Sequence, residues 1–120
     1  MATASGSTID FTGIPSTVKR LTVMLRGISL SGSDRILVQI GSGSFTTSGY
    51  VATSGIFTTG GATNAVSSTS AFILLAGDSA AIITGQMVIT NISTNSWVQS
   101  GTFKRSTSSM EFSAGDVSIG

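Results

Sequence analysis

The chain has 120 residues, a length that suits one domain with a single core. Charged residues make up only 9% of it, against about 25% in an average protein, and the net charge is +1. Its basic clusters, Lys19–Arg20 and Lys104–Arg105, are too small to indicate nucleic acid as a partner. The most apolar stretch, residues 71–76, is too short to insert in a membrane, and the first residues do not resemble a signal peptide.

The N-terminal part of the chain predicts an arm followed by two strands. Residues 1–8 are small and polar, and we expect a flexible arm there, with one β-sandwich domain over residues 9–120. Ile9–Phe11 alternates and predicts a short strand, which Pro15 separates from the next element. Residues 18–28 give the clearest strand pattern, with apolar side chains on one face and polar ones on the other.

The middle of the chain is rich in Gly, Ser and Thr. Residues 35–40 predict a strand, and residues 45–53 predict another that is broken near Gly49. Residues 54–70 leave two alternatives, a long loop or a loop with a short strand at 55–58. Residues 71–76 are apolar on both faces, so that strand needs the core on one side and a loop or another subunit on the other.

The C-terminal part predicts two long strands and short final ones. Residues 82–92 and 96–104 alternate, and apolar residues near 110–112 and 117–119 indicate short strands. No segment has a helical period, and turn signals recur at short spacing. The fold class that follows is all-β, a single antiparallel β-sandwich, jelly-roll-like, with seven or eight strands.

The residue types present speak against an enzyme. The sequence contains no His and no Cys, which removes the commonest general base, thiolate nucleophiles and the usual zinc ligands. Of its five acidic residues, Asp34 and Asp78 lie in turn contexts, where Asp commonly bonds its own backbone. We therefore expect no catalytic residues, no metal site and no cofactor.

Two aromatic side chains are candidates for ligand binding. Tyr50 and Trp97 combine a large ring with a polar group, and such rings can stack on sugars or fill an interface pocket. The alternative is that they pack inside the domain. Trp97 falls in an alternating strand, which favours packing, whereas Tyr50 lies beside a glycine-rich turn and leaves both roles open.

The segment Phe11-Thr-Gly-Ile-Pro-Ser16, followed by Val18-Lys-Arg20, an apolar strand and Gly27, resembles a pattern of tailed-bacteriophage virion proteins. Those proteins are often described as tail fibre or structural proteins. The pieces Leu37–Gly41, Thr47–Tyr50 and Asn95–Val98 follow in the same order, so the resemblance spans most of residues 9–103. The resemblance carries no catalytic motif.

The chain departs from this pattern in two places. Thr17 stands where the pattern often has Trp. Relatives also usually continue with a further hairpin, so that either this hairpin is absent or residues 112–119 form a shortened closing strand. If the hairpin is absent, an exposed sheet edge would need a partner to cover it.

The resemblance implies a virion structural protein, made in the host cytoplasm and built into the particle. We expect a tail-fibre or spike-type module, trimeric, with other virion proteins as partners and a role in host-surface attachment. One alternative is a capsid decoration protein (a cement or head-fibre protein) that stabilises or decorates the shell. A second alternative is a carbohydrate-binding module that uses Tyr50 or Trp97 to bind a host-surface glycan.

Overall fold

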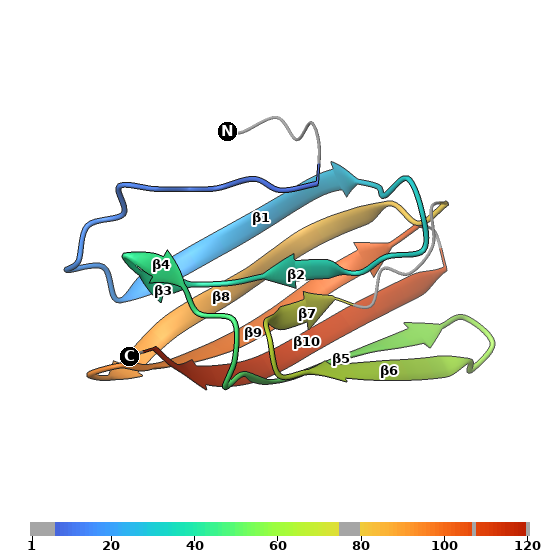
Figure 1. Ribbon diagram of the computed structural model, residues 1–120. Coiled ribbons are helices and arrows are strands. Elements are labelled where there is room, and N and C mark those ends of the chain that lie inside the picture. Colours follow the sequence, from blue (N-terminus) through green and yellow to red (C-terminus); the bar gives the residue numbers. More distant parts are fainter. Residues whose placement is uncertain (1–6, 75–79, 107, 120) are drawn as a thin grey trace.

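A computed structural model describes residues 7–74, 80–106 and 108–119 of the chain. The main layer is a six-stranded antiparallel sheet in the order β1-β8-β9-β10-β5-β6 (Figure 1). Its strands are β1 (Arg20–Ile28), β5 (Val51–Thr58), β6 (Thr63–Ser68), β8 (Ile83–Ser93), β9 (Ser96–Arg105) and β10 (Ser109–Ser118).

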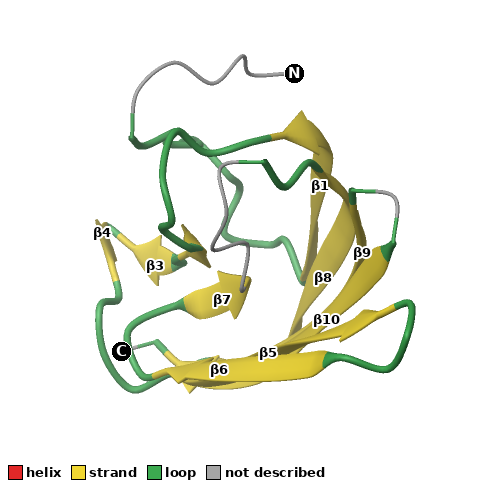
Figure 2. Ribbon diagram, turned by 90° about the vertical axis from the view of Figure 1, so that its right-hand side faces the viewer, coloured by secondary structure: helices red, strands yellow, loops and turns green. Residues whose placement is uncertain are grey.

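A second, smaller layer covers one face of this sheet (Figure 2). It contains β2 (Ile36–Val38) paired with β7 (Phe72–Leu74), and a small hairpin of β3 (Gly41–Ser42) and β4 (Ser44–Phe45). The predicted all-β sandwich is therefore confirmed, with layers of unequal size. The described residues contain no helix. We call the face of the main sheet that packs on the second layer the inner face, and the opposite one the outer face.

Strand β8 shows why the sequence folds in this way. Its residues alternate, so that Ile83, Met87 and Ile89 lie on the inner face, each at most 1% exposed. The intervening residues Thr84, Gln86, Val88 and Thr90 lie on the outer face, and all of them except Val88 are polar. Both the position of this strand and its buried face agree with the prediction for residues 82–92.

Glycine makes room for an aromatic ring in the centre of the inner face. Phe103 of β9 is almost completely buried beside Met87 of β8. A Cβ atom on Gly101 would lie 2.7 Å from Cε2 of Phe103 and 2.9 Å from Cβ of Met87. Glycine at position 101 is thus required by close packing and not by an unusual backbone conformation.

The short strand β7 lies entirely within the fold. Phe72, Ile73 and Leu74 are all buried, as the apolar pattern of this stretch predicts. Their cover comes from the chain itself, so that no other subunit is needed at this strand. The last residues of the predicted strand, 75 and 76, lie outside the described part.

The C-terminal strand differs from the prediction of short pieces. β10 is one continuous strand of ten residues, and it pairs with β9 on one side and β5 on the other. Because both of its edges are paired, the C-terminal strand leaves no open sheet edge. The outermost strands of the main sheet are β1 and β6.

Two further predictions need correction. The sequence left residues 54–70 as a long loop or as a loop with one short strand at 55–58. Residues 63–68 instead form β6, which joins β5 through a turn at Gly60 and Gly61, with φ angles of 100° and 94°. The predicted short strand Ile9–Phe11 is not formed, because these residues have no ladder partner within the described chain. The alternation that predicted a strand there is nevertheless present.

Candidate binding face

Tyr50 is a structural residue of the core. It is 1% exposed, and its ring packs edge-on against Phe72 with centroids 5.0 Å apart. Its hydroxyl accepts a hydrogen bond from N of Ile40 at 3.0 Å and donates to the carbonyl oxygen of Thr46 at 3.0 Å. Burial raises the pKa of this hydroxyl, and the hydrogen bond from Ile40 opposes that effect. The structure thus leaves no ring face of Tyr50 exposed for a sugar, and of the two roles that the sequence left open for this residue it displays packing.

Trp97 is partly buried and packs against the core at one end of β9. Its cross-strand neighbours are Asn91 on β8 and Val117 on β10. The packing role that its alternating strand favours is therefore present. The ring contact of Tyr50 is with Phe72 and not with Trp97, and a ligand at Trp97 stays a prediction.

The acidic residues do not form a metal-binding cluster within the described ranges. Asp34 and Asp116 are exposed, whereas Glu111 is fully buried on the inner face of β10. The predicted turn residue Asp78 lies outside the described part. Likewise, the described residues include no helix that could cross a bilayer.

A short row of buried polar side chains crosses the inner face. The Ser54 hydroxyl donates to Oε1 of Glu111 at 2.8 Å, and Nε2 of Gln99 donates to Oγ of Ser113 at 2.6 Å. The amide oxygen of Gln99 has no hydrogen-bond partner among the described residues. These groups are enclosed, so they stabilise the packing of β5, β9 and β10 and offer no open site for a substrate.

The outer face of the main sheet carries exposed apolar side chains. Phe57 on β5 is 54% exposed and Phe112 on β10 is 41% exposed, and their rings meet edge-to-face with centroids 5.8 Å apart. Met110 lies directly across from Phe57 in the ladder, and Met24 on β1 is also exposed. Because the second layer packs on the other face, no described part of the chain covers these side chains.

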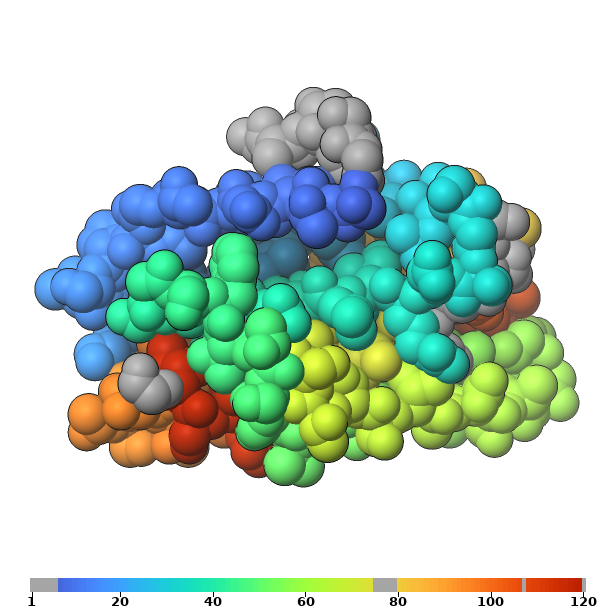
Figure 3. All heavy atoms as spheres, viewed as in Figure 1, coloured from blue at the N-terminus to red at the C-terminus, as the bar shows by residue number. Residues whose placement is uncertain are grey.

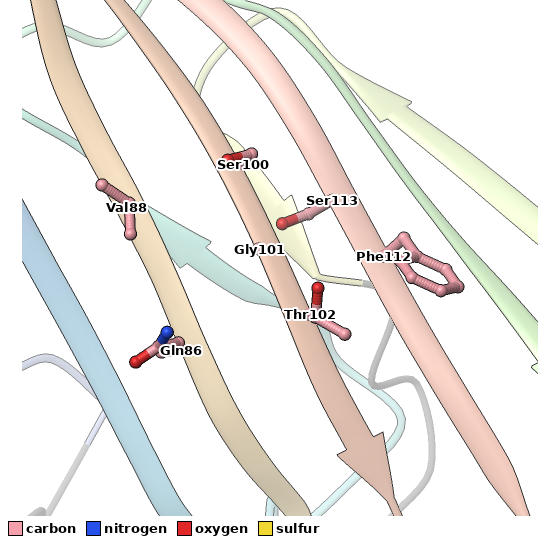
Figure 4. A pocket seen from close by; sticks show the side chains of 7 residues that line it. All are labelled: Gln86, Val88, Ser100, Gly101, Thr102, Phe112 and Ser113. Carbon is pink, nitrogen blue, oxygen red and sulfur yellow. The ribbon is translucent and has the colours of Figure 1, made fainter.

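Two shallow depressions lie beside these rings. The first, of about 320 Å³, crosses β8, β9 and β10, and Figure 4 views it from the outer side, with β2 and β7 behind the sheet. Its lining residues are all uncharged: Gln86, Val88, Ser100, Gly101, Thr102, Phe112 and Ser113. The second, of about 570 Å³, includes Phe57, Lys104 and Met110. We call this region, centred on Phe57, Met110 and Phe112, the outer apolar patch.

Sequence reasoning did not single out the outer apolar patch. The signal was available in the alternation of β10, where Glu111 and Val117 share one face and Met110 and Phe112 share the other. Glu111 is an acidic residue on the inner face, so charge alone does not identify the face of β10 on which Phe112 lies. The pairing of Phe112 with Phe57 also needs the β5–β10 register, which follows from the fold as a whole.

The fold and the patch together define a class: a two-layer antiparallel β protein with an apolar patch on one uncovered sheet face. Comparisons with known protein families, curated proteins and solved structures gave no match for this chain.

Proposed function

We propose that the chain is a structural protein of a bacteriophage particle, a tail-fibre or spike-type module that assembles through protein–protein contacts. The resemblance of residues 11–29 to tailed-phage virion proteins supports the phage assignment. The observation that supports an assembling role is the outer apolar patch. Its two Phe rings and the side chain of Met110 stand on a face that the second layer leaves uncovered.

Apolar surface that stays exposed to water is unfavourable. Monomeric soluble proteins rarely expose large contiguous apolar patches, and such patches commonly mark contacts with other proteins. Aromatic and Met side chains are enriched at protein interfaces, and charged ones are depleted at their centres. The composition of this patch, with Lys104 at its margin, fits that description.

The proposed assembly is a homotrimer with other virion proteins as further partners. The resemblance supports this number of subunits. The stretch Phe72–Leu74, which is apolar on both faces, gives no support for a trimer, because the chain covers it by itself. Attachment to a host-surface glycan would fall to Trp97 or to the outer apolar patch, because Tyr50 is buried.

The location of the protein on the particle separates the fibre proposal from capsid decoration. Antibody labelling and electron microscopy of the virus particle should place the chain on the tail or on a fibre. Many copies spread over the shell would overturn the fibre proposal and favour a decoration protein. A chain missing from the purified particle would overturn the virion assignment itself.

The role of the outer apolar patch can be tested in the purified protein. We expect Phe57→Ser to weaken self-association in sedimentation velocity, because it removes an exposed ring from the patch centre. A matched control is Phe45→Ser, which removes a similarly exposed ring on the second layer. Equal effects of the two substitutions, or no effect of Phe57→Ser, would contradict a contact through this patch.

A further inference from the structure

Strand β1 has an open hydrogen-bonding edge. Among the residues that the structure describes, it is the outermost strand of the main sheet and pairs only with β8. The N–H of Asn91 donates to the carbonyl oxygen of Lys19, its partner in the extended register. Bonded and non-bonded positions alternate in antiparallel ladders, so Leu21 also faces β8, whereas Arg20 and Thr22 direct their backbone groups to the open edge.

The apolar face of β1 is also incompletely covered. Leu21, Val23 and Leu25 lie on the inner face and pack against the core cluster, but they are only partly buried. The β8 residues opposite Leu21 and Val23, which are Ile89 and Met87, are almost completely buried. The same edge therefore lacks both a strand partner and part of its apolar cover.

The arm before β1 has the pattern of a strand without a partner. Ile9 and Phe11 alternate with Thr8, Asp10 and Thr12, and the two apolar side chains are 44% and 63% exposed. Within the described chain, no backbone–backbone hydrogen bond involves residues 7–14. The arm runs back in the direction opposite to β1 (Figure 1), and Figure 3 shows it as a ridge with a hollow between it and the second layer.

We infer that residues 8–12 of one copy add as a strand to the open edge of β1 in a second copy. Ile9 and Phe11 then cover the inner-face side chains of β1, and Asp10 falls on the outer face. Arg20 and Arg26 of β1 also lie on that face, so the added strand brings opposite charges together. Addition of a strand to a sheet edge is a common mode of protein recognition.

The recipient is a second copy because the arm does not pair with the edge of its own chain. The arm is tied to β1 by a turn, in which N of Val18 donates to the carbonyl oxygen of Pro15 at 3.1 Å. Although this turn keeps the arm near the open edge of β1 in the same chain, the described residues of the arm form no strand pairing with that edge. Each copy donates one arm and receives one, and such head-to-tail contacts close into a ring when the rotation between copies permits it. The inference thus rests on the proposed homo-oligomer and names one of its contacts.

Sedimentation velocity of Phe11→Asp tests this contact in the full chain. A charge on the covered side of the arm should raise the dissociation constant of the oligomer at least about tenfold. The matched control is Phe45→Asp, which places the same charge at an exposed ring outside the arm and should leave the oligomer intact. Because Phe11 is exposed in the single chain, circular dichroism should show an unchanged fold.

The possible results separate this inference from the proposed function. An oligomer that survives Phe11→Asp overturns the arm exchange and leaves the homo-oligomer standing. A wild-type chain that stays monomeric at micromolar concentration overturns both.

A disulfide experiment identifies the recipient of the arm, since the chain has no cysteine of its own. Phe11→Cys and Val23→Cys chains, coexpressed and oxidised, should yield a covalent dimer that contains one chain of each kind. Phe45→Cys in place of Phe11→Cys should not. In the double variant F11C/V23C, a disulfide that stays within one chain would show that the arm pairs with its own edge and would overturn exchange between copies.

Discussion

Replacing Gly101 with Ala should destabilise the fold, because the added methyl group has no space. Its Cβ atom would stand 2.7 Å from Cε2 of Phe103, 2.9 Å from Cβ of Met87 and 2.9 Å from Oγ of Ser113. Favourable contacts between carbon atoms need about 3.5–4.0 Å, so the neighbours must move by roughly 1 Å. All three neighbours are buried, and the Cβ of Met87 can shift only with its backbone.

The expected size of this effect combines two opposing terms. Overpacking of a well-filled core costs about 1–3 kcal/mol, and the loss of glycine's freedom in the unfolded chain returns about 0.4–1 kcal/mol. The free energy of unfolding should therefore fall by about 1–2 kcal/mol. For a domain of this size, the melting temperature should drop by roughly 4 °C for each kcal/mol.

Urea unfolding followed by the fluorescence of Trp97, the only Trp in the chain, measures this change. Both proteins are compared at the same concentration, because self-association shifts apparent stability. The control is Gly32→Ala, where the added Cβ would meet nothing within 4 Å. If Gly101→Ala proved as stable as Gly32→Ala, the close packing described for the inner face would be refuted.

Two further predictions concern the buried polar groups. The pKa of Tyr50 is raised in the folded state, so near and above about pH 10 the unfolded chain loses this proton before the folded chain does. The free energy of unfolding should therefore fall as the pH rises. Tyr50→Phe should flatten this pH dependence, measured by urea unfolding from about pH 8 to about pH 11. Since this is the only Tyr, its absorbance near 295 nm reports the titration directly, and an ordinary pKa there would contradict its burial. Ser54→Ala removes a hydrogen-bond donor to the buried Glu111 and should lower the free energy of unfolding by about 1–3 kcal/mol. The control is Ser67→Ala on the exposed strand β6, which should change the free energy of unfolding little. Equal urea midpoints for the two variants would contradict the buried hydrogen bond.

The strands that the sequence predicted well are those with one buried and one exposed face. β8 alternates in nearly every position, and its buried residues follow directly from that alternation. β6 escaped prediction because most of its side chains are exposed, so it has no apolar phase. Its main local signal was the pair Gly60–Gly61, a dipeptide typical of hairpin turns.

The candidate site was harder to predict because it depends on contacts between distant strands. The burial of Tyr50 comes from Phe72 on β7 and from hydrogen bonds with Ile40 and Thr46, none of which a local pattern reveals. Similarly, Gly115 interrupts the apolar pattern of β10, and only pairing on both sides makes this segment one continuous strand.

The central position of β10 has a consequence for the order in which the protein folds during synthesis. β8, β9 and β10 are joined by tight turns and can form a meander as soon as they leave the ribosome. The β5–β6 hairpin and β1 are made much earlier, yet β5 pairs with β10, and β1 pairs with β8. Pairings between distant segments form slowly. We therefore expect β1 to lack its partner until residues near 93 have emerged, and β5 to lack β10 until residues near 118 have emerged, so that their apolar side chains stay open to chaperones until then.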